Sequence, residues 1–196
     1  WVDSLFANLY HEPDVASRRP LLTAPYDALL EIAEPPESPE TRWLRVRLPD
    51  GRRAWVQRGD VRLDNPAVSL GEAIALAHRF AGIPYLWGGT SSFGLDCSGF
   101  TQLLLRRRGF RVPRDAAPQA NWQGMSPIAR ADLEAGDLLY FGEHPEKITH
   151  TGMYLGGGEF IHSTAHRLPR VQVSRLDDPH WSGLLVACRR PRPEAR

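Results

Sequence analysis

Several classes of protein are excluded by what this sequence lacks. Its 196 residues include two cysteines, Cys97 and Cys188, too few for a disulfide framework or a cysteine-rich metal site. No apolar run approaches the ~18–20 residues that cross a membrane. The 24 Lys and Arg and the 23 Asp and Glu leave a net charge of +1 and no broad basic field. We therefore expect neither a membrane nor a nucleic acid as a partner.

The composition that is present indicates a folded chain. Hydrophobic residues make up 42% of the sequence and charged residues 24%, which excludes wholesale disorder. At ~100–200 residues per domain, the length suffices for one domain or two small ones. The sequence does not begin with Met, and Trp1 follows no signal-like segment, so the N-terminus does not identify a compartment.

Residues 1–65 are predicted to form short strands. Trp43 to Leu48 alternate between apolar and polar residues, which is typical of a half-buried strand. Pro49-Asp50-Gly51 supplies a turn, and Ala54-Trp55-Val56 begins the return strand. The apolar run Leu29 to Ile32 predicts a further strand. Short strands separated by Pro and Gly predict a small β-barrel.

This stretch resembles the bacterial SH3-like (SH3b) family. The resemblance rests on the pattern W-x-x-V at Trp43, the following Asp-Gly turn and Trp55-Val56, although Ala54 stands where the family usually has Gly. Trp1-Val2-Asp3 echoes Trp55-Val56-Gln57. We therefore interpret Trp1-Val2 as the tail of an earlier SH3b module upstream, an interpretation that an initiating Met directly before Trp1 would exclude.

Residues 66–196 are predicted to form a second, α+β domain. Ser69 and Glu72 are spaced as a capping box at the start of a helix that ends near Gly82. A Gly-rich loop follows, and a second helix is expected from about Cys97 to Arg108. The predicted strands are Asp137–Phe141, Ile148–Leu155 and Glu159–Ser163, the last two joined by three glycines. Helices followed by antiparallel strands indicate an α+β fold.

Cys97 is the candidate nucleophile. It lies between the Gly-rich loop and an apolar run, which places it at a helix N-terminus. Unpaired N–H groups and the helix dipole there favour an anion, so we expect the thiol pKa to lie below its usual ~8.5. A buried structural cysteine is the alternative. Cys188, in an apolar run, is interpreted as a core cysteine.

Two of the seven histidines are candidates for the base and its orienting partner. If the three glycines form the hairpin loop, Leu155 pairs with Glu159, and His150 and His162 lie on one face as diagonal neighbours. A two-residue loop would place them on opposite faces. A hydrogen-bonded structural histidine is the alternative for either residue. The others are interpreted as surface or loop residues: His11, His78, His144, His166 and His180.

The motifs together resemble the NlpC/P60 family of cysteine peptidases. They occur in the family's order and cover nearly all of residues 70–190: Tyr85–Thr90, Gly94–Phe100, Val112–Asp115, Gly136-Asp137 and the span from His150 to His162. The resemblance implies a papain-like α+β core. It also implies hydrolysis of amide bonds in peptidoglycan stem peptides, commonly between γ-D-glutamate and a diamino acid.

The resemblance also implies the role of each site residue. Cys97 would be the nucleophile, His150 the general base and His162 the residue that orients His150. The Tyr85 hydroxyl would help the Cys97 backbone N–H to stabilise the oxyanion. No metal or organic cofactor is required. Zinc bound by the cysteine and the two histidines is the alternative, which a helix-start thiol preceded by Asp96 disfavours.

Within the family, the sequence is closer to enzymes that act on released muropeptides with a free N-terminal L-Ala, the γ-D-glutamyl-L-diamino acid endopeptidases. Asp115 follows Val-Pro-Arg as in that group, and its carboxylate is suited to a substrate ammonium; a helix or turn cap is the alternative. Asp96 and Ser98 are candidates for holding the peptide's N-terminal end, although wall-trimming relatives carry them too. Trp87 either lines the pocket or packs in the core. For Trp122 and Trp181 core packing is favoured, with a place in the pocket wall as the alternative.

The sequence therefore predicts a γ-D-glutamyl-diamino-acid endopeptidase whose partners are peptidoglycan-derived peptides. A DL-endopeptidase that cuts intact wall is the alternative among peptidases. A non-catalytic wall-binding protein is a further alternative, which intact Cys97, His150 and His162 disfavour. A lipid acyltransferase on a related scaffold is disfavoured because no long apolar groove is indicated. A recycling role favours the cytoplasm over the cell envelope, and the oligomeric state is not indicated.

Overall fold

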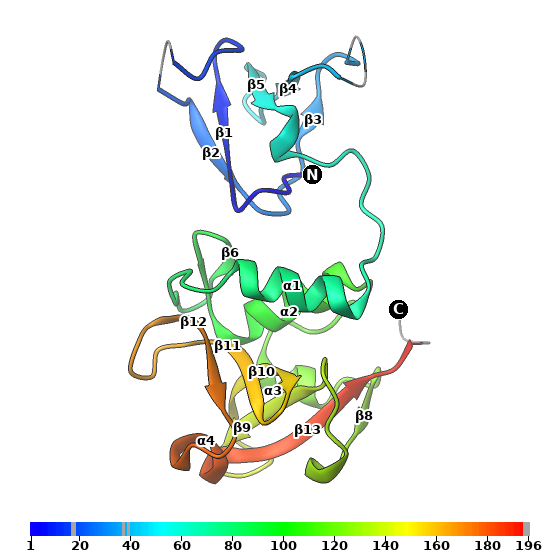
Figure 1. Cartoon of the computed structure of the whole chain (residues 1–196), viewed down its shortest axis with the longest axis vertical. Helices are drawn as coiled ribbons and strands as arrows, with labels where there is room; N and C mark the ends of the chain where they lie inside the picture. The colour runs from blue at the N-terminus through cyan, green and yellow to red at the C-terminus, as the bar shows by residue number, and fades with distance from the viewer. Residues whose placement is uncertain (17–18, 37, 39, 194–196) are drawn as a thin grey trace. The chain divides into compact units, whose positions relative to one another are not determined.

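The computed structural model describes residues 1–16, 19–36, 38 and 40–193, and these form two compact units, Trp1–Asn65 and Pro66–Arg196 (Figure 1). Each unit has its own hydrophobic core. Within the described part of the chain, no helix is both long and apolar enough to span a membrane.

The N-terminal unit is a curled five-stranded antiparallel sheet with strand order β2-β1-β5-β4-β3 (Figure 1). Its elements are β1 (Phe6–Tyr10), β2 (Leu22–Pro25), β3 (Glu31–Ile32), β4 (Trp43–Arg47), β5 (Arg53–Gln57) and the short helix η1 (Arg58–Asp60). The predicted alternation in β4 is confirmed, because Leu44, Val46 and Leu48 are buried. The turn is confirmed as well, since Gly51 has a φ of 84° and its N–H bonds to Leu48 O.

The predicted strand from Leu29 to Ile32 is wrong in extent. Glu31 and Ile32 alone pair with β4, and Leu29 is 71% exposed. The chain turns at Asp27, which has a φ of 65°, and Ala28 N–H bonds back to Pro25 O. This turn removes the residues before Glu31 from the ladder.

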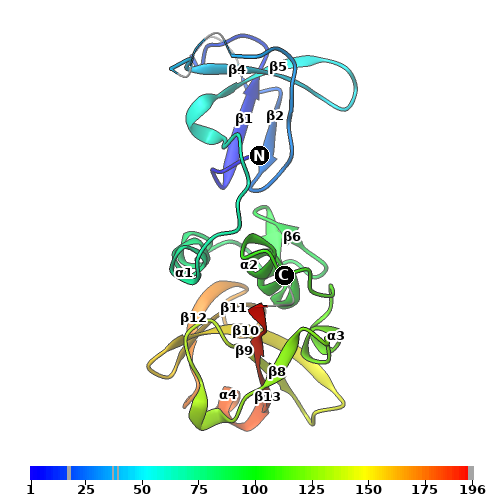
Figure 2. The same cartoon turned by 90° about the vertical axis from the view of Figure 1, so that its right-hand side faces the viewer.

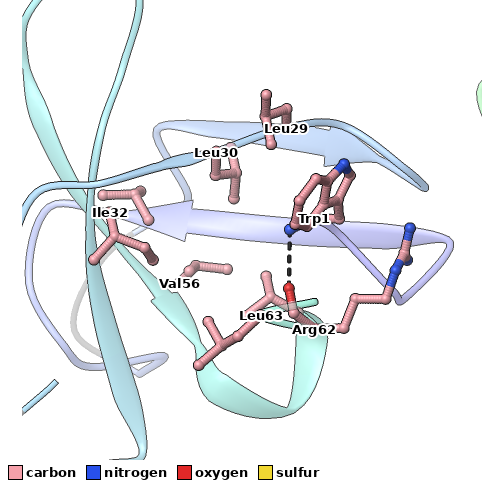
Figure 3. A pocket seen from close by; sticks show the side chains of 9 residues that line it. Trp1, Leu29, Leu30, Ile32, Val56, Arg62 and Leu63 are labelled. Atoms are coloured by element: carbon pink, nitrogen blue, oxygen red, sulfur yellow. Dashed lines mark hydrogen bonds between the residues drawn. The ribbon is translucent and has the colours of Figure 1, made fainter. Parts of the chain in front are cut away.

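Trp1 and Val2 pack within this unit. Val2 is fully buried and forms a bridge with Val61, and the Trp1 amine donates to Arg62 O at 2.9 Å. Trp1, Leu29 and Leu63 are among the residues that line a small apolar cavity of about 120 Å³, and Figure 3 shows their side chains. These two residues are therefore part of this unit's own structure.

The C-terminal unit is a six-stranded antiparallel sheet with helices packed against it (Figures 1 and 2). Its helices are α1 (Leu70–Arg79), α2 (Cys97–Arg107), α3 (Ala116–Ala120), α4 (Pro179–Leu184) and the short η2 (Arg130–Asp132). Its strands, in sheet order, are β12 (Arg170–Arg175), β11 (Glu159–Thr164), β10 (Ile148–Gly156), β9 (Leu138–Gly142), β13 (Leu185–Pro191) and β8 (Met125–Pro127). A separate ribbon pairs β6 (Thr90–Ser91) with β7 (Gly94–Leu95). α2 and α3 pack against β10, and α4 packs against β9.

Local signals in the sequence fix the two long helices. The predicted capping box is confirmed at α1, where Ser69 accepts from Glu72 N–H and the Glu72 carboxylate accepts from Ser69 N–H. The predicted start of α2 at Cys97 is also confirmed, with Asp96 as its N-cap. Helix α3 was not predicted, because it has only five residues and includes a proline.

The hairpin between β10 and β11 differs from the predicted one. Gly156, not Leu155, pairs with Glu159, so the loop is the two residues Gly157 and Gly158. The register shifts between Tyr154 and Gly156, and this bulge returns the strands to the predicted pairing, with Tyr154 opposite Phe160. The predicted loop is wrong, but the prediction that the two histidines share a face is confirmed by their direct contact.

Candidate active site

A cavity of about 770 Å³ in the C-terminal unit gathers most of the predicted site residues. Its lining includes six of them: Tyr85, Trp87, Asp96, Cys97, Ser98 and Asp115. Arg114, Ile148 and Thr149 also line it, and His150 follows Thr149 on β10. The start of α2, the start of α3 and the start of β10 therefore converge here.

Cys97 is the first residue of α2 and lies at the wall of this cavity with 8% of its surface exposed. The expected fall in its pKa is wrong. Burial raises the pKa of the Cys97 thiol, and the charge of Asp96 adds to the rise. Hydrogen bonds from the backbone N–H groups of Thr151 and Ser98 act in the opposite direction and are outweighed. The resting thiol is therefore protonated, and it lies beside Thr151, the residue after His150.

Asp96 caps α2 and is fixed by an arginine. Its carboxylate accepts from Gly99 N–H at 2.7 Å and from Gly88 N–H at 3.0 Å. Arg114 donates to both carboxylate oxygens, at 3.0 and 2.6 Å. Burial acts to raise the pKa of Asp96, but the hydrogen bonds from Arg114 and Gly99 outweigh it and leave the pKa lowered. The carboxylate is thus ionised and already paired.

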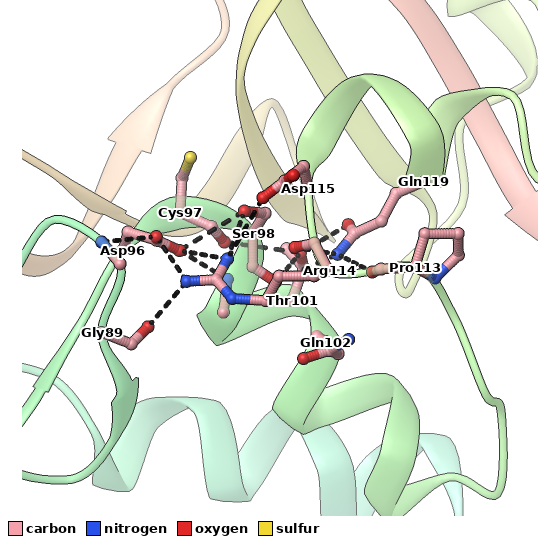
Figure 4. Close-up of polar contacts among 12 residues, drawn as sticks. Gly89, Asp96, Cys97, Ser98, Thr101, Gln102, Pro113, Arg114, Asp115 and Gln119 are labelled. Atoms are coloured by element: carbon pink, nitrogen blue, oxygen red, sulfur yellow. Dashed lines mark hydrogen bonds and ion pairs between the residues drawn. The ribbon is translucent and has the colours of Figure 1, made fainter.

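The same arginine holds Ser98. Arg114 Nη1 donates to Ser98 Oγ at 2.9 Å, and Gln119, which is fully buried, donates to the Ser98 carbonyl at 3.0 Å. Figure 4 shows the Cys97 sulfur pointing away from this network. Asp96, Ser98 and Arg114 are thus bonded to one another at the start of α2, next to the thiol, and all three also line the cavity.

The Asp115 carboxylate, unlike that of Asp96, is exposed. It occupies the N-cap position of α3, but among the described residues its side chain makes no capping hydrogen bond. Its side chain is 78% exposed, and Arg114 Nη1 lies 3.9 Å from Oδ1. The capping alternative is therefore wrong, and the carboxylate is open to the cavity.

His150 and His162 are in direct contact on the sheet. His150 Nε2 lies 2.7 Å from His162 Nδ1, and His162 Nε2 lies 3.0 Å from Ser174 Oγ. Burial lowers the pKa of His150 to about 3 and that of His162 well below its usual value, so both rings are neutral at pH 7. Trp181 stacks on His150 with ring centroids 5.1 Å apart.

The position of the His162 ring depends on the absence of a side chain at Gly152. A Cβ at Gly152 would lie 3.0 Å from the His162 Cβ and 2.9 Å from the Phe160 ring. The missing side chain of Gly152 thus makes room for His162 on the neighbouring strand.

The two aromatic candidates lie at the cavity. Burial raises the pKa of the Tyr85 phenol, and the Asp96 carboxylate and an ionised Cys97 raise it further, so the hydroxyl is protonated and able to donate. Trp87 is 86% exposed and lines the cavity, so the core-packing alternative for it is wrong. Within the residues that the structure describes, no group of three or more His, Cys, Asp or Glu is arranged to hold a metal ion.

The sequence did not predict roles for Arg114, Gln119 and Ser174, and for Trp181 it favoured packing in the core. Arg114 follows Val-Pro directly before the candidate Asp115, which is a usable signal for a site residue. Trp181 is buried at 5% exposure, as expected, but it also supports the His150 ring. The contact of Ser174 with His162 depends on the pairing of β11 with β12, which no local pattern indicates.

Comparison with known proteins identifies the family of this chain. The family model described as NlpC/P60 family matches residues 82–190. The gamma-D-glutamyl-L-lysine dipeptidyl-peptidase of Bacillus cereus (strain ATCC 10987 / NRS 248) is 35% identical over 80% of this chain and 48% of its own length. The Bacillus subtilis (strain 168) protein of the same name is 37% identical over 77% of this chain and 51% of its own length.

The crystal structure of an NlpC/P60 family protein from Bacillus cereus ATCC 10987 superposes with a TM-score of 0.81 at 33% identity, covering 98% of this chain and 62% of that one. The chain spans about half the length of the curated relatives that it matches. The family match and the peptidase names of these relatives support a cysteine peptidase. The chain belongs to the NlpC/P60 family and has its papain-like α+β fold.

Proposed function

We propose that this chain is a cysteine peptidase that cleaves the amide bond between γ-D-glutamate and a diamino acid in muropeptides with a free N-terminal L-Ala. The observation that carries the proposal is the thiol of Cys97, at the start of a helix and beside the strand of the His150–His162 pair, in a cavity that also presents the Asp115 carboxylate. The names of the two Bacillus relatives support the same bond.

The proposed first step transfers one proton and forms one bond. As the Cys97 sulfur attacks the γ-carbonyl carbon, His150 takes the thiol proton, because the resting pair is neutral. The tetrahedral oxyanion receives hydrogen bonds from the Cys97 backbone N–H and the Tyr85 hydroxyl. His150 then gives its proton to the leaving amine as the C–N bond breaks.

The second step restores the enzyme. His150 takes a proton from a water molecule as that water attacks the thioester carbonyl. The C–S bond then breaks, and His150 returns the proton to the sulfur. The products are L-Ala-γ-D-Glu and the free diamino acid. His162 orients His150 throughout, and no cofactor or metal enters the sequence of steps.

Asp115 is the proposed determinant for the free amine. Its carboxylate is exposed at the cavity, whereas the Asp96 carboxylate is already paired with Arg114. Of these two carboxylates, Asp115 is the more exposed and the more loosely paired, since Arg114 lies 3.9 Å from it and 2.6 Å from Asp96, so it is the one accessible to an ammonium at the substrate's N-terminus. We assign Asp96 and Ser98 to positioning the nucleophile, and Trp87 to the cavity wall.

The domain assignment is part of the proposal. Residues 1–65 would be an SH3-like module and residues 66–196 the peptidase domain. The curled antiparallel sheet of the N-terminal unit supports the first assignment, and the family match to residues 82–190 supports the second. Peptidoglycan-derived peptides are the proposed substrates, with cytoplasmic muropeptide recycling as the corresponding role.

The test is digestion of L-Ala-γ-D-Glu-L-Lys and its diaminopimelate analogue, each beside its N-acetylated twin, followed by mass spectrometry. We expect release of L-Ala-γ-D-Glu from the free peptides alone, and no release with Cys97→Ala. Asp115→Asn should raise KM for the free peptides by about tenfold, the loss expected for one charged contact. Equal cleavage of free and acetylated peptides would instead establish the DL-endopeptidase that cuts intact wall. No cleavage of any peptide would favour the wall-binding protein.

A further inference from the structure

The histidine pair ends at a hydroxyl group that the proposed reaction does not use. His162 is fully buried, and its Nε2 lies 3.0 Å from Ser174 Oγ. Ser174 lies on β12 opposite Phe160, two residues beyond the position that pairs with His162. It is therefore a diagonal neighbour of His162. His150, His162 and Ser174 form a hydrogen-bonded chain across three adjacent strands.

The contacts determine which ring nitrogens of His150 and His162 donate a hydrogen bond and which accept one. Since His162 occupies Nε2 of His150, Nδ1 is the ring nitrogen that remains to take the Cys97 proton. A neutral imidazole that accepts at Nδ1 carries its own proton on Nε2, so His150 must donate to His162 Nδ1. His162 then accepts at Nδ1 and carries its proton on Nε2. That proton needs an acceptor, and among the described residues the acceptor is Ser174 Oγ.

We propose that Ser174 is a positioning residue that holds His162, and through it His150, in the tautomer able to deprotonate Cys97. The inference rests on the proposed function and extends it by a fourth residue. With the hydroxyl as acceptor, both rings carry their protons on Nε2, and His150 presents an unprotonated Nδ1 to the thiol. In the reverse arrangement His162 donates to His150, whose proton then lies on Nδ1, and His150 is no base for Cys97.

Because both histidines are buried, the choice between the two tautomers affects whether His150 is able to accept the Cys97 proton. Both rings stay neutral because burial lowers the pKa of each, so each exists as one tautomer or the other. A buried N–H without an acceptor is strongly unfavourable. Loss of the hydroxyl therefore favours the arrangement in which His162 Nε2 carries no proton, which is the unproductive one.

The cavity next to Ser174 determines which substitution is informative. Ser174 is half-buried and lines a second cavity of about 470 Å³ together with Trp181. Water in this cavity is able to replace the hydroxyl of a smaller residue. Thr and Val have nearly the same shape and differ in that Thr carries a hydroxyl where Val carries a methyl group. Both are β-branched and are favoured in strands. Ser174→Thr and Ser174→Val are therefore the matched pair.

The experiment measures kcat and KM of both variants with L-Ala-γ-D-Glu-L-Lys. We expect Ser174→Val to lower kcat by about tenfold with KM unchanged, the effect of one lost hydrogen bond, and Ser174→Thr to retain most of kcat. Equal kcat values for the two variants would overturn the proposal. Thermal unfolding of both variants serves as the folding control.

A second readout does not depend on activity. In ¹⁵N-histidine-labelled protein at pH 7, nitrogen chemical shifts should show His150 and His162 protonated at Nε2 in the wild type and in Ser174→Thr, and a shift toward Nδ1 protonation of His162 in Ser174→Val. Protonation of wild-type His162 at Nδ1 would overturn the proposal. If the wild type cleaves no peptide, the proposed function fails, whereas the nitrogen shifts still decide the role of Ser174.

Discussion

Two groups of residues at the candidate active site, one at the start of α2 and one on the sheet, are held in place by different forces. On the helix side, formed by Asp96, Cys97, Ser98 and Arg114, opposite charges and backbone N–H groups fix the start of α2. On the sheet side, formed by His150, His162, Ser174 and Trp181, neutral rings stack and share hydrogen bonds. The difference teaches which force suits which task. The residues proposed to position the nucleophile are held by an ion pair, and the histidine proposed to gain and lose a proton is kept neutral by burial.

The largest effect is expected from removing the proposed base on the sheet side. His150→Ala should lower kcat for L-Ala-γ-D-Glu-L-Lys by about a thousandfold, because general-base catalysis contributes ~10²–10⁴-fold. The measurement is kcat with purified variant, with circular dichroism as the folding control. Activity within tenfold of the wild type would mean that another group takes the thiol proton.

The two groups of residues should lose their contributions to the unfolding free energy at different pH values. Burial lowers the pKa of His150 to about 3 and lowers that of His162, whereas unfolded histidine titrates near 6.5. The unfolded chain therefore binds more protons below pH 6.5, and unfolding free energy should fall by about 1.4 kcal/mol per pH unit for each histidine as pH drops. The pKa of Asp96 is lowered from 3.8, so its contribution is present above that pH and is lost only below it.

Urea unfolding from pH 8 to pH 4 checks this separation. His150→Gln should flatten the profile between pH 6.5 and pH 4, while Asp96→Asn should leave its slope there unchanged. A flat wild-type profile over this range would show that the histidines are not buried as neutral groups.

A smaller loss is expected from breaking the ion pair on the helix side. The Arg114 and Asp96 side chains are 31% and 11% exposed, so Arg114→Gln should lower the unfolding free energy by about 2 kcal/mol, less than for a fully buried pair. Asp96→Asn combined with Arg114→Gln should recover part of the loss, because no unpaired carboxylate remains. Strictly additive losses in this double-variant cycle, measured by urea unfolding, would contradict a direct pairing.

The smallest effect is expected from filling the space beside His162 with a side chain at position 152. Gly152→Ala should lower the unfolding free energy by about 1–2 kcal/mol, because the new Cβ lies 3.0 Å from that of His162. It should also lower kcat by displacing the ring. The matched control is Gly71→Ala in α1, where a Cβ meets no described atom within 4 Å and a gain of about 0.5 kcal/mol is expected. Equal effects of the two substitutions on thermal unfolding would show that Gly152 gives no special room to His162.

The sequence is informative wherever the cause is local. The capping box at Ser69, the strand alternation from Trp43 and the helix start at Cys97 each follow from residues a few positions apart, and all three were predicted. The shared face of the histidines was also predicted, although the bulge at Leu155 that preserves it was not. Three successive glycines permit both loops, so the sequence does not choose between them.

The rest of the site depends on distant parts of the chain. The helix N-terminus alone predicts a lowered Cys97 pKa, but packing of α2 against β10 buries the thiol and reverses the direction. Arg114 pairs with a residue 18 positions away, and Ser174 bonds one 12 positions away on a different strand. Such partners follow from how the elements meet, which no local pattern contains.

The most direct test of this account is the pH dependence of Cys97 alkylation by iodoacetamide, with peptide mapping to separate Cys97 from Cys188. Because burial raises the pKa of the thiol, Cys97 should remain protonated at pH 7, and its labelling rate should rise steadily up to and beyond pH 9. A labelling rate that is already constant between pH 5 and pH 8 would reveal a preformed thiolate–imidazolium pair. That result would contradict the neutral sheet side on which the account depends.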